Sequence, residues 1–209
     1  ISVVYPHMNS MGGDNFWLIS DKNKKVTAID ACGPAAKNAS IDSYKKQGLN
    51  QIPSRGALSA LTVPGAVSGW KLAHDFSVKN LGGKLPLSRL LYDAEQVSKD
   101  GIAVTNTLKN NLKSKLSQLI DIPGFKEIYL KDGRIPEVGD KLVFPAMSKT
   151  FSKLIQNGLD DFYIGEISKN IISDLSDLGS PLSKIDFNNY NASLVKPLEL
   201  KIKNTKLFN

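Results

Sequence analysis

The sequence predicts a mixed α/β fold, because strand patterns open and close the chain while helical patterns fill its middle. Two β-rich runs, residues 14–20 and 25–31, are separated by a polar cluster that is typical of a hairpin turn. Apolar residues then recur at helical spacing over much of residues 65–179. Alternation of apolar and polar residues returns at 192–195 and 198–202, and we expect these strands to find their pairing partners outside the chain.

Capping residues, glycines and prolines divide the middle of the chain into separate elements. A short helix at 41–47 is followed by a segment, 48–64, whose Gly, Pro and Ser residues predict a long loop of the kind that often serves a site. Residues 125–143 hold a DG turn, a GD turn and a proline, so short extended pieces are predicted there. Helices are expected at 65–76, 87–97, 105–119, 146–156 and 160–179, with one more helical turn at 183–190.

The composition is that of a globular protein and excludes several classes. With 209 residues, 41% of them apolar, the chain can bury one sizeable core, and it has no apolar run of about 18 residues that would span a membrane. The net charge of +7 comes from lysines scattered over turns and polar helix faces, without a basic stripe, so we expect no nucleic-acid partner. One cysteine and two distant histidines lack ligand spacing, so neither a metal nor another cofactor is expected.

The first residues carry no sign of a natural start. Residues 1–19 begin without a methionine or a basic leader and already follow an alternating apolar pattern, so we expect further chain upstream. The lack of a leader favours the cytoplasm over export, but with an incomplete start the compartment stays open.

Three short motifs occur in order in the first third of the chain: PHMNSMGGDNFWLI at 6–19, AIDACGPAA at 28–36 and TVPGAVSGW at 62–70. Together they resemble the amino-terminal part of the large subunit of the γ-glutamyltranspeptidase-like N-terminal nucleophile hydrolases. Three later stretches look like the helical lobe of the same family: 82–101, 139–168 and 180–192. The resemblance therefore covers nearly the whole chain.

The resemblance implies a four-layer αββα sandwich that two subunits share. Residues 1–209 would then form a single but incomplete domain, the large-subunit portion. Its expected parts are core strands at 1–36, a loop-rich pocket segment at 37–66, a helical lobe at 67–190 and returning strands at 191–209.

The same resemblance implies how such proteins become active. A precursor cuts itself ahead of a threonine, whose free α-amine then serves as the base for its own hydroxyl during acyl transfer. We expect no catalytic residue in this chain, because its threonines are internal, among them Thr62, Thr105, Thr107, Thr150 and Thr205. The nucleophile is expected on a small-subunit partner from the same precursor, and the processed heterodimers are expected to form homo-oligomers.

The motif at 28–36 departs from the family pattern at a position that bears on substrate choice. Family transpeptidases carry there an arginine that grips the α-carboxylate of the substrate, and this chain carries Cys32. A thiol cannot form the paired contacts of a guanidinium, so we expect an amide substrate other than a γ-glutamyl compound. A second interpretation makes Cys32 a nucleophile paired with His7 or His74, although a small buried packing residue is the simpler expectation.

Three further residues are candidate substrate contacts. His7 precedes the Gly12-Gly13 turn, which the resemblance places near the active-site wall, and Asp14 adds polarity where many family members continue a glycine run. Arg55 is one of three arginines and lies in the loop that leads into the TVPG motif. It could replace the missing anion contact or simply bind backbone carbonyls, and both roles stay open.

The sequence thus favours the large-subunit portion of a self-processing amide hydrolase or acyltransferase that acts on a small amide or peptide. The alternative is a non-catalytic relative that keeps the fold and binds such a ligand without turnover. A threonine directly after a self-cleavage site in the complete protein would distinguish the two.

Overall fold

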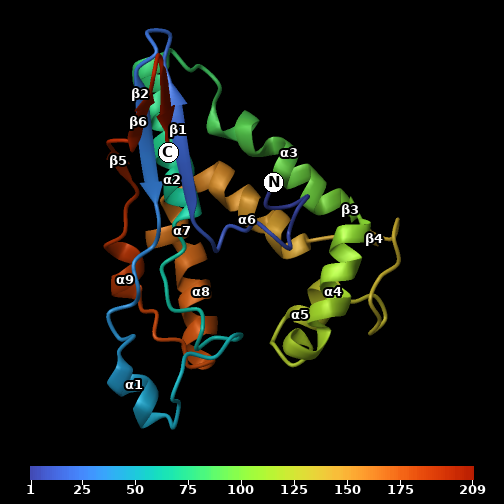
Figure 1. Cartoon of the computed structure of the whole chain (residues 1–209). Coiled ribbons are helices and arrows are strands. Elements are labelled where there is room, and N and C mark those ends of the chain that lie inside the picture. The colour runs from blue at the N-terminus through green and yellow to red at the C-terminus, as the bar shows by residue number, and fades with distance from the viewer.

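A three-stranded antiparallel sheet forms one side of the computed structural model, which describes residues Ile1–Asn209 (Figure 1). The predicted hairpin at the start of the chain is confirmed. Ile29, in the central strand, pairs with Leu194, so the hairpin is joined by a strand from the far end of the sequence. The strands are β1 (Asn15–Ser20), β2 (Val26–Ala31) and β5 (Ser193–Val195), in the order β1-β2-β5.

Helix α2 (Ala66–Phe76) covers one face of this sheet (Figure 1). Successive residues of a strand point to opposite faces, and Ile29, which is 1% exposed, lies on the covered face. The opposite face carries Phe16, Leu18 and Val195, which are 69%, 49% and 39% exposed. The sheet is therefore packed on one side and leaves an apolar face open on the other.

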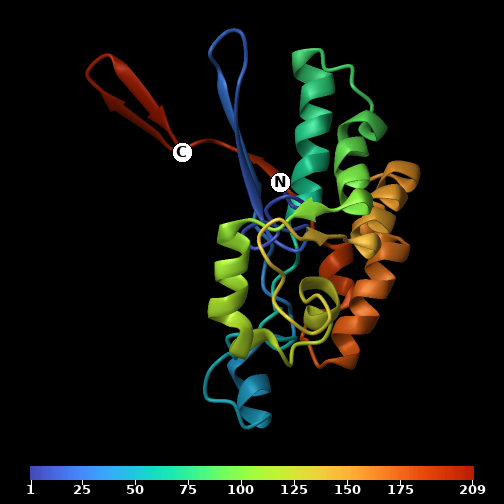
Figure 2. The same ribbon diagram turned by 90° about the vertical axis from the view of Figure 1, so that its right-hand side faces the viewer.

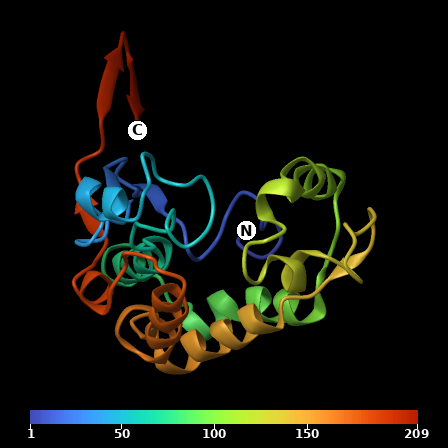
Figure 3. The ribbon, with the colours of Figure 1, turned by 90° about the horizontal axis from the view of Figure 1, so that it is seen from below.

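The helical lobe packs beside this sheet, and its helices α3 (Leu87–Asp100) and α6 (Pro145–Asn157) lie side by side (Figure 3). Its core includes Leu108, Phe151, Leu154 and Phe187, each at most 2% exposed. The remaining elements before the last strands are α1 (Ile41–Lys46), a π-helix (Ser77–Leu81), β3 (Ile102–Ala103), α4 (Asn106–Leu119), α5 (Phe125–Tyr129), β4 (Lys141–Leu142), α7 (Asp161–Ile164), α8 (Glu166–Asp177) and α9 (Lys184–Asn188).

The extended conformation predicted for residues 125–143 is wrong for its first part. Helix α5 forms there because Phe125 is buried in the core and its ring lies 5.6 Å from that of Tyr129, one helical turn further on. The rest of the segment contains turns and the short strand β4, as the DG and GD dipeptides predict.

The single helix predicted at 160–179 is two helices in the structure. The break falls at Gly165, which ends α7 and precedes α8. The carboxylate of Asp161 accepts a hydrogen bond of 3.2 Å from the backbone N–H of Glu166. This bond satisfies one of the free amides at the start of α8 and fixes the turn between the two helices.

The closing strands have partners within the chain, so the expectation that these partners lie outside it is wrong. β5 pairs with β2, and β6 (Glu199–Ile202) pairs with an unpredicted strand, β7 (Thr205–Phe208). Lys203 adopts a φ of 51°, which lets the chain turn back between them. The β6–β7 hairpin stands away from the body (Figure 2), and its Leu200 is 60% exposed.

Neither a membrane-spanning helix nor a cluster of metal-binding side chains occurs in the structure. None of the helices combines the length and the apolarity that crossing a bilayer requires. No three His, Cys, Asp or Glu side chains gather in an arrangement that could hold a metal ion.

Candidate functional site

The three motifs of the first 70 residues converge at the end of β2 and the start of α2. The carbonyl oxygen of Gly13 accepts hydrogen bonds from the backbone N–H groups of Gly65 and Ala66, at 2.9 and 2.8 Å. A Cβ atom on Gly33 would lie 1.5 Å from the carbonyl oxygen of Val63. Only glycine therefore lets these backbone segments approach so closely.

Asp14 joins two of these segments through both of its carboxylate oxygens. Oδ1 accepts a hydrogen bond of 2.9 Å from the backbone N–H of Gly33, and Oδ2 accepts one of 3.5 Å from the thiol of Cys32. Asn15 joins the third segment, because its side-chain amide donates to the carbonyl oxygen of Ala66 at 2.9 Å. Asp14 and Asn15, which directly follow the Gly12-Gly13 turn, thus tie the motifs together, and Asp14 remains exposed.

Cys32 is exposed, so the expectation of a buried packing residue is wrong. Strand β2 ends at the fully buried Ala31, and the next residue turns outward. Partial desolvation, followed by the negative charges of Asp14 and Asp30, raises the pKa of the Cys32 thiol. The thiol is therefore protonated at neutral pH and is a poor nucleophile.

No hydrogen bond joins either histidine to Cys32. The ring of His7 lies 4.2 Å from that of Tyr5, and both of its nitrogens are buried without a hydrogen-bond partner in the chain. Nε2 of His74 lies 3.1 Å from the carbonyl oxygen of Leu85. The base that a cysteine nucleophile requires is absent, so the structure gives no support to that interpretation.

Two buried tyrosines, Tyr163 and Tyr190, complete the cluster. The sequence analysis did not identify either of them as a site residue. The Tyr163 hydroxyl accepts a hydrogen bond from the backbone N–H of Ser68 at 2.9 Å and donates one to the carbonyl oxygen of Pro64 at 2.7 Å. Tyr190 is 8% exposed, and its hydroxyl has no partner in the chain. Burial and, secondarily, the charge of Asp14 raise the pKa of Tyr190 to about 12. Because 95 and 99 residues separate Tyr163 from its partners, no local spacing reveals these contacts.

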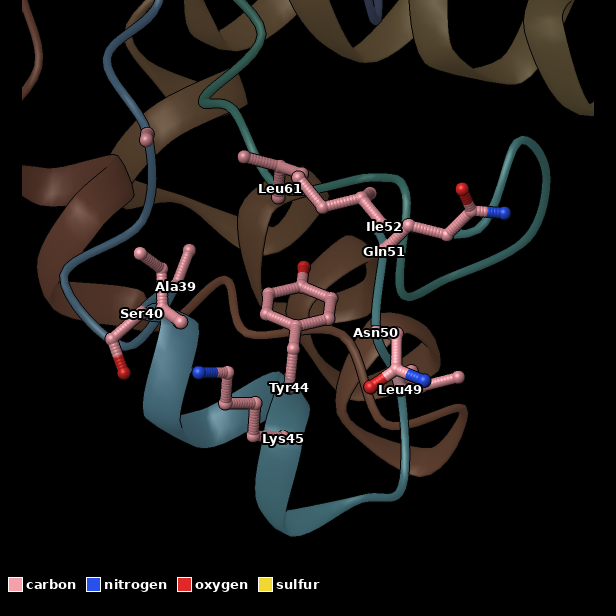
Figure 4. A pocket seen from close by; sticks show the side chains of 11 residues that line it. Ala39, Ser40, Tyr44, Lys45, Leu49, Asn50, Gln51, Ile52 and Leu61 are labelled. Carbon is pink, nitrogen blue, oxygen red and sulfur yellow. The ribbon is translucent and has the colours of Figure 1, made fainter.

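Arg55 makes no hydrogen bond to this cluster. Its side chain is exposed, and its Nη1 donates to the carbonyl oxygen of the neighbouring Ser54 at 3.2 Å. The surrounding loop-rich segment forms a separate pocket of about 270 Å³, in which Tyr44 stands between α1 and the loop that carries Ile52 and Leu61 (Figure 4). Arg55 does not line that pocket, so the structure leaves its role as a substrate contact to experiment.

A large cavity opens beside the glycine turn. Its volume of about 770 Å³ is within the range of ligand pockets, and it lies between Gly12, Pro64 and the helices α6 and α8. Buried Phe162 and Phe187 form part of its apolar wall, and Lys149 adds a positive charge. The converging motifs therefore border a space that can hold a small ligand.

The whole chain, residues 1–209, matches the family model described as gamma-glutamyltranspeptidase. It is 40% identical to the oxamate amidohydrolase proenzyme of Klebsiella pneumoniae, over 100% of this chain and 39% of that protein. It is 30% identical to the glutathione hydrolase proenzyme of Escherichia coli, over 92% of this chain and 33% of that protein. The solved gamma-glutamyltranspeptidase of Helicobacter pylori superposes with a TM-score of 0.88 at 25% identity, over 99% of this chain and 59% of that one.

The fold and the converging motifs are those of an N-terminal nucleophile hydrolase. This chain belongs to the γ-glutamyltranspeptidase family, as its three motifs predict. It spans 39% and 33% of the lengths of the two proenzymes, which are therefore much longer than the part described in this structure.

Proposed function

We propose that this chain is the large-subunit portion of a self-processing amide hydrolase whose specificity excludes γ-glutamyl compounds. The observation that carries the proposal is the hydrogen bond between the Cys32 thiol and the exposed carboxylate of Asp14. The motif resemblance implies that family transpeptidases carry an arginine at the position of Cys32. An exposed carboxylate beside a neutral thiol repels the α-carboxylate of a γ-glutamyl substrate. The 40% identity to a protein named oxamate amidohydrolase proenzyme supports an amide substrate of another kind.

In this proposal the chain shapes the substrate pocket and the rest of the precursor supplies the nucleophile. A threonine hydroxyl oxygen bonds to the amide carbon, the C–N bond breaks, and the amine leaves with a proton. Water then cleaves the resulting ester and regenerates the hydroxyl. Cys32 and Asp14 form the wall that faces the acyl group, and His7 and Arg55 are flanking contacts.

The exposed apolar face of the sheet is evidence that a partner segment from the same precursor packs against it. Phe16, Leu18 and Val195 form an apolar surface that a second sheet would bury. The small subunit is the proposed occupant, and the processed heterodimers are proposed to form homo-oligomers. The substrate is a small amide or peptide, with no nucleic-acid or membrane partner.

Expression of the complete precursor tests this function. Intact-mass measurement should show two chains, the smaller beginning with threonine, and replacing that threonine by alanine should leave the precursor uncut. The processed protein should hydrolyse small amides such as oxamate with a higher kcat/KM than a γ-glutamyl anilide. A processed protein without amidase activity would support the non-catalytic alternative, and preferred turnover of the γ-glutamyl anilide would contradict the proposed specificity.

A further inference from the structure

A third pocket lies between β1, α2 and the start of α3, at the point where α2 passes into the π-helix. It has a volume of about 280 Å³ and is lined by both tryptophans of the chain, Trp17 from β1 and Trp70 from α2. Its other lining side chains include His74, Lys84, Leu85 and Leu90. Trp17 and Trp70 belong to the first and third motifs, but the pocket shares no lining residue with the large cavity beside the glycine turn, and the proposed acyl transfer makes no use of it.

The backbone beside this pocket has a rare conformation. π-Helices are uncommon and occur frequently at functional sites. This one ends at Gly82, whose φ is 72°, and the N–H of Gly83 then donates to the carbonyl oxygen of Ser77 at 3.0 Å. The chain returns over α2, where the carbonyl oxygen of Leu85 lies 3.1 Å from Nε2 of His74. These bonds hold the returning segment as one wall of the pocket.

The lining favours a flat ring that carries a negative charge. Indole rings present broad apolar faces that stack with other aromatic groups. Lys84 supplies a positive charge, and no Asp or Glu lines the pocket. The indole N–H of Trp17 is bonded to Oδ1 of Asn15 at 3.0 Å, whereas that of Trp70 makes no hydrogen bond in the chain.

The pocket is also accessible. Leu85 and Leu90 at its rim are 59% and 48% exposed, and exposed apolar groups around a pocket mark binding surfaces. Its volume is near the lower end of the range for ligand pockets, which fits a single ring. We propose that this pocket binds a small planar aromatic carboxylate, separately from the amide substrate.

The test uses the complete processed protein and 4-fluorobenzoate, whose binding is followed by fluorine NMR of the ligand. We expect saturable line broadening, with a Kd that rises about threefold to fivefold in Lys84→Ala, because the lost charge pair is partly exposed. Lys79→Ala is the matched control, since Lys79 is an exposed lysine of the π-helix that does not line the pocket. The neutral analogue 4-fluorobenzyl alcohol should bind more weakly and should not respond to Lys84→Ala.

A variant that fills the pocket tests whether 4-fluorobenzoate binds there. Ala73 lines it from α2, so Ala73→Leu should abolish the broadening, while intact-mass evidence of self-processing shows that the variant has folded. Absence of saturable broadening with the unaltered protein would overturn the proposal. So would an unchanged Kd in Lys84→Ala, or binding that persists in a processed Ala73→Leu protein.

Discussion

The thiol of Cys32 and the carboxylate of Asp14 share a hydrogen bond of 3.5 Å, which links the end of β2 to the start of β1. The same carboxylate accepts the backbone N–H of Gly33 at 2.9 Å. The pair therefore holds two motifs together, and its exposed carboxylate is the feature on which the proposed specificity rests. Substitutions at these residues can separate the structural role from the chemical one.

Cys32→Arg should shift the specificity of the processed protein toward γ-glutamyl substrates. A new charge-assisted contact to a carboxylate is worth about 1.5 to 3 kcal/mol, so we expect the ratio of kcat/KM for a γ-glutamyl anilide to that for a small neutral amide to rise about 10-fold to 100-fold. Combining it with Asp14→Gly, which removes the competing carboxylate, should give the larger shift. Cys32→Ser is the control and should keep the original ratio. An unchanged ratio in both arginine variants would show that this wall does not face the acyl group.

Arg55 is tested with a pair of substrates that differ in charge. If its guanidinium contacts an anionic group, Arg55→Ala should raise KM for an anionic amide about tenfold and leave the KM of the neutral analogue unchanged, with Arg55→Lys in between. Steady-state kinetics on the processed protein provide the measurement. Equal losses on both substrates, or loss of folding, would assign Arg55 to the structure of its loop.

Tyr163→Phe should destabilise the protein by about 1 to 3 kcal/mol, because the backbone N–H of Ser68 and the carbonyl oxygen of Pro64 would lose their buried partner. Urea unfolding followed by circular dichroism gives the free energy of unfolding. Tyr129→Phe is the matched control, since the Tyr129 hydroxyl makes no hydrogen bond in the chain and its loss should cost little. Equal effects of the two substitutions would mean that the Tyr163 bonds contribute no net stability.

The stability of the helical lobe should depend on the ionisation of Asp186. Burial opposes its charge, but hydrogen bonds from Ser183 and from the backbone N–H of Lys37 outweigh burial and lower the pKa of Asp186. A carboxyl group whose pKa is lowered by folding contributes stability above its unfolded pKa of about 4, and this stability is lost as the pH falls through the folded value. Asp186→Asn should therefore flatten the decline of the urea midpoint below about pH 4. The exposed Asp177→Asn serves as control, and equal slopes in the two variants would count against this role.

The exposed apolar face of the sheet predicts that residues 1–209 aggregate when they are expressed without the rest of the precursor. With Phe16 and Leu18 exposed, we expect the isolated chain to aggregate, as light scattering would detect. Leu18→Lys should reduce that aggregation and should also weaken assembly with the remaining segment. A monomeric isolated chain with a cooperative thermal transition would contradict the expectation.

Local patterns predict much of this fold, because helix caps, turns and apolar spacing depend on residues that are close together in the sequence. The first hairpin and most helices follow in this way, and the close approach of Gly33 to Val63 explains why the motifs contain glycine. Helix α5 could not be predicted, since it depends on the burial of Phe125 in a core built by distant elements. The exposure of Cys32 likewise depends on where β2 ends, and the position of Tyr163 depends on packing across the whole chain.

Two hydrogen bonds between residues far apart in the sequence limit how early this fold can form during synthesis. The backbone N–H of Lys37 bonds to Asp186, 149 residues later, and that of Ala192 bonds to the hydroxyl of Ser68 across 124 residues. Ribosomes add about 5 to 20 residues per second, so the first of these bonds forms no sooner than roughly 7 to 30 s after Lys37 is incorporated. Throughout that interval the edge of β2 that later receives β5 is free to pair with other nascent chains. Slow translation or low chaperone capacity should therefore reduce the yield of this protein more than that of one with local pairing.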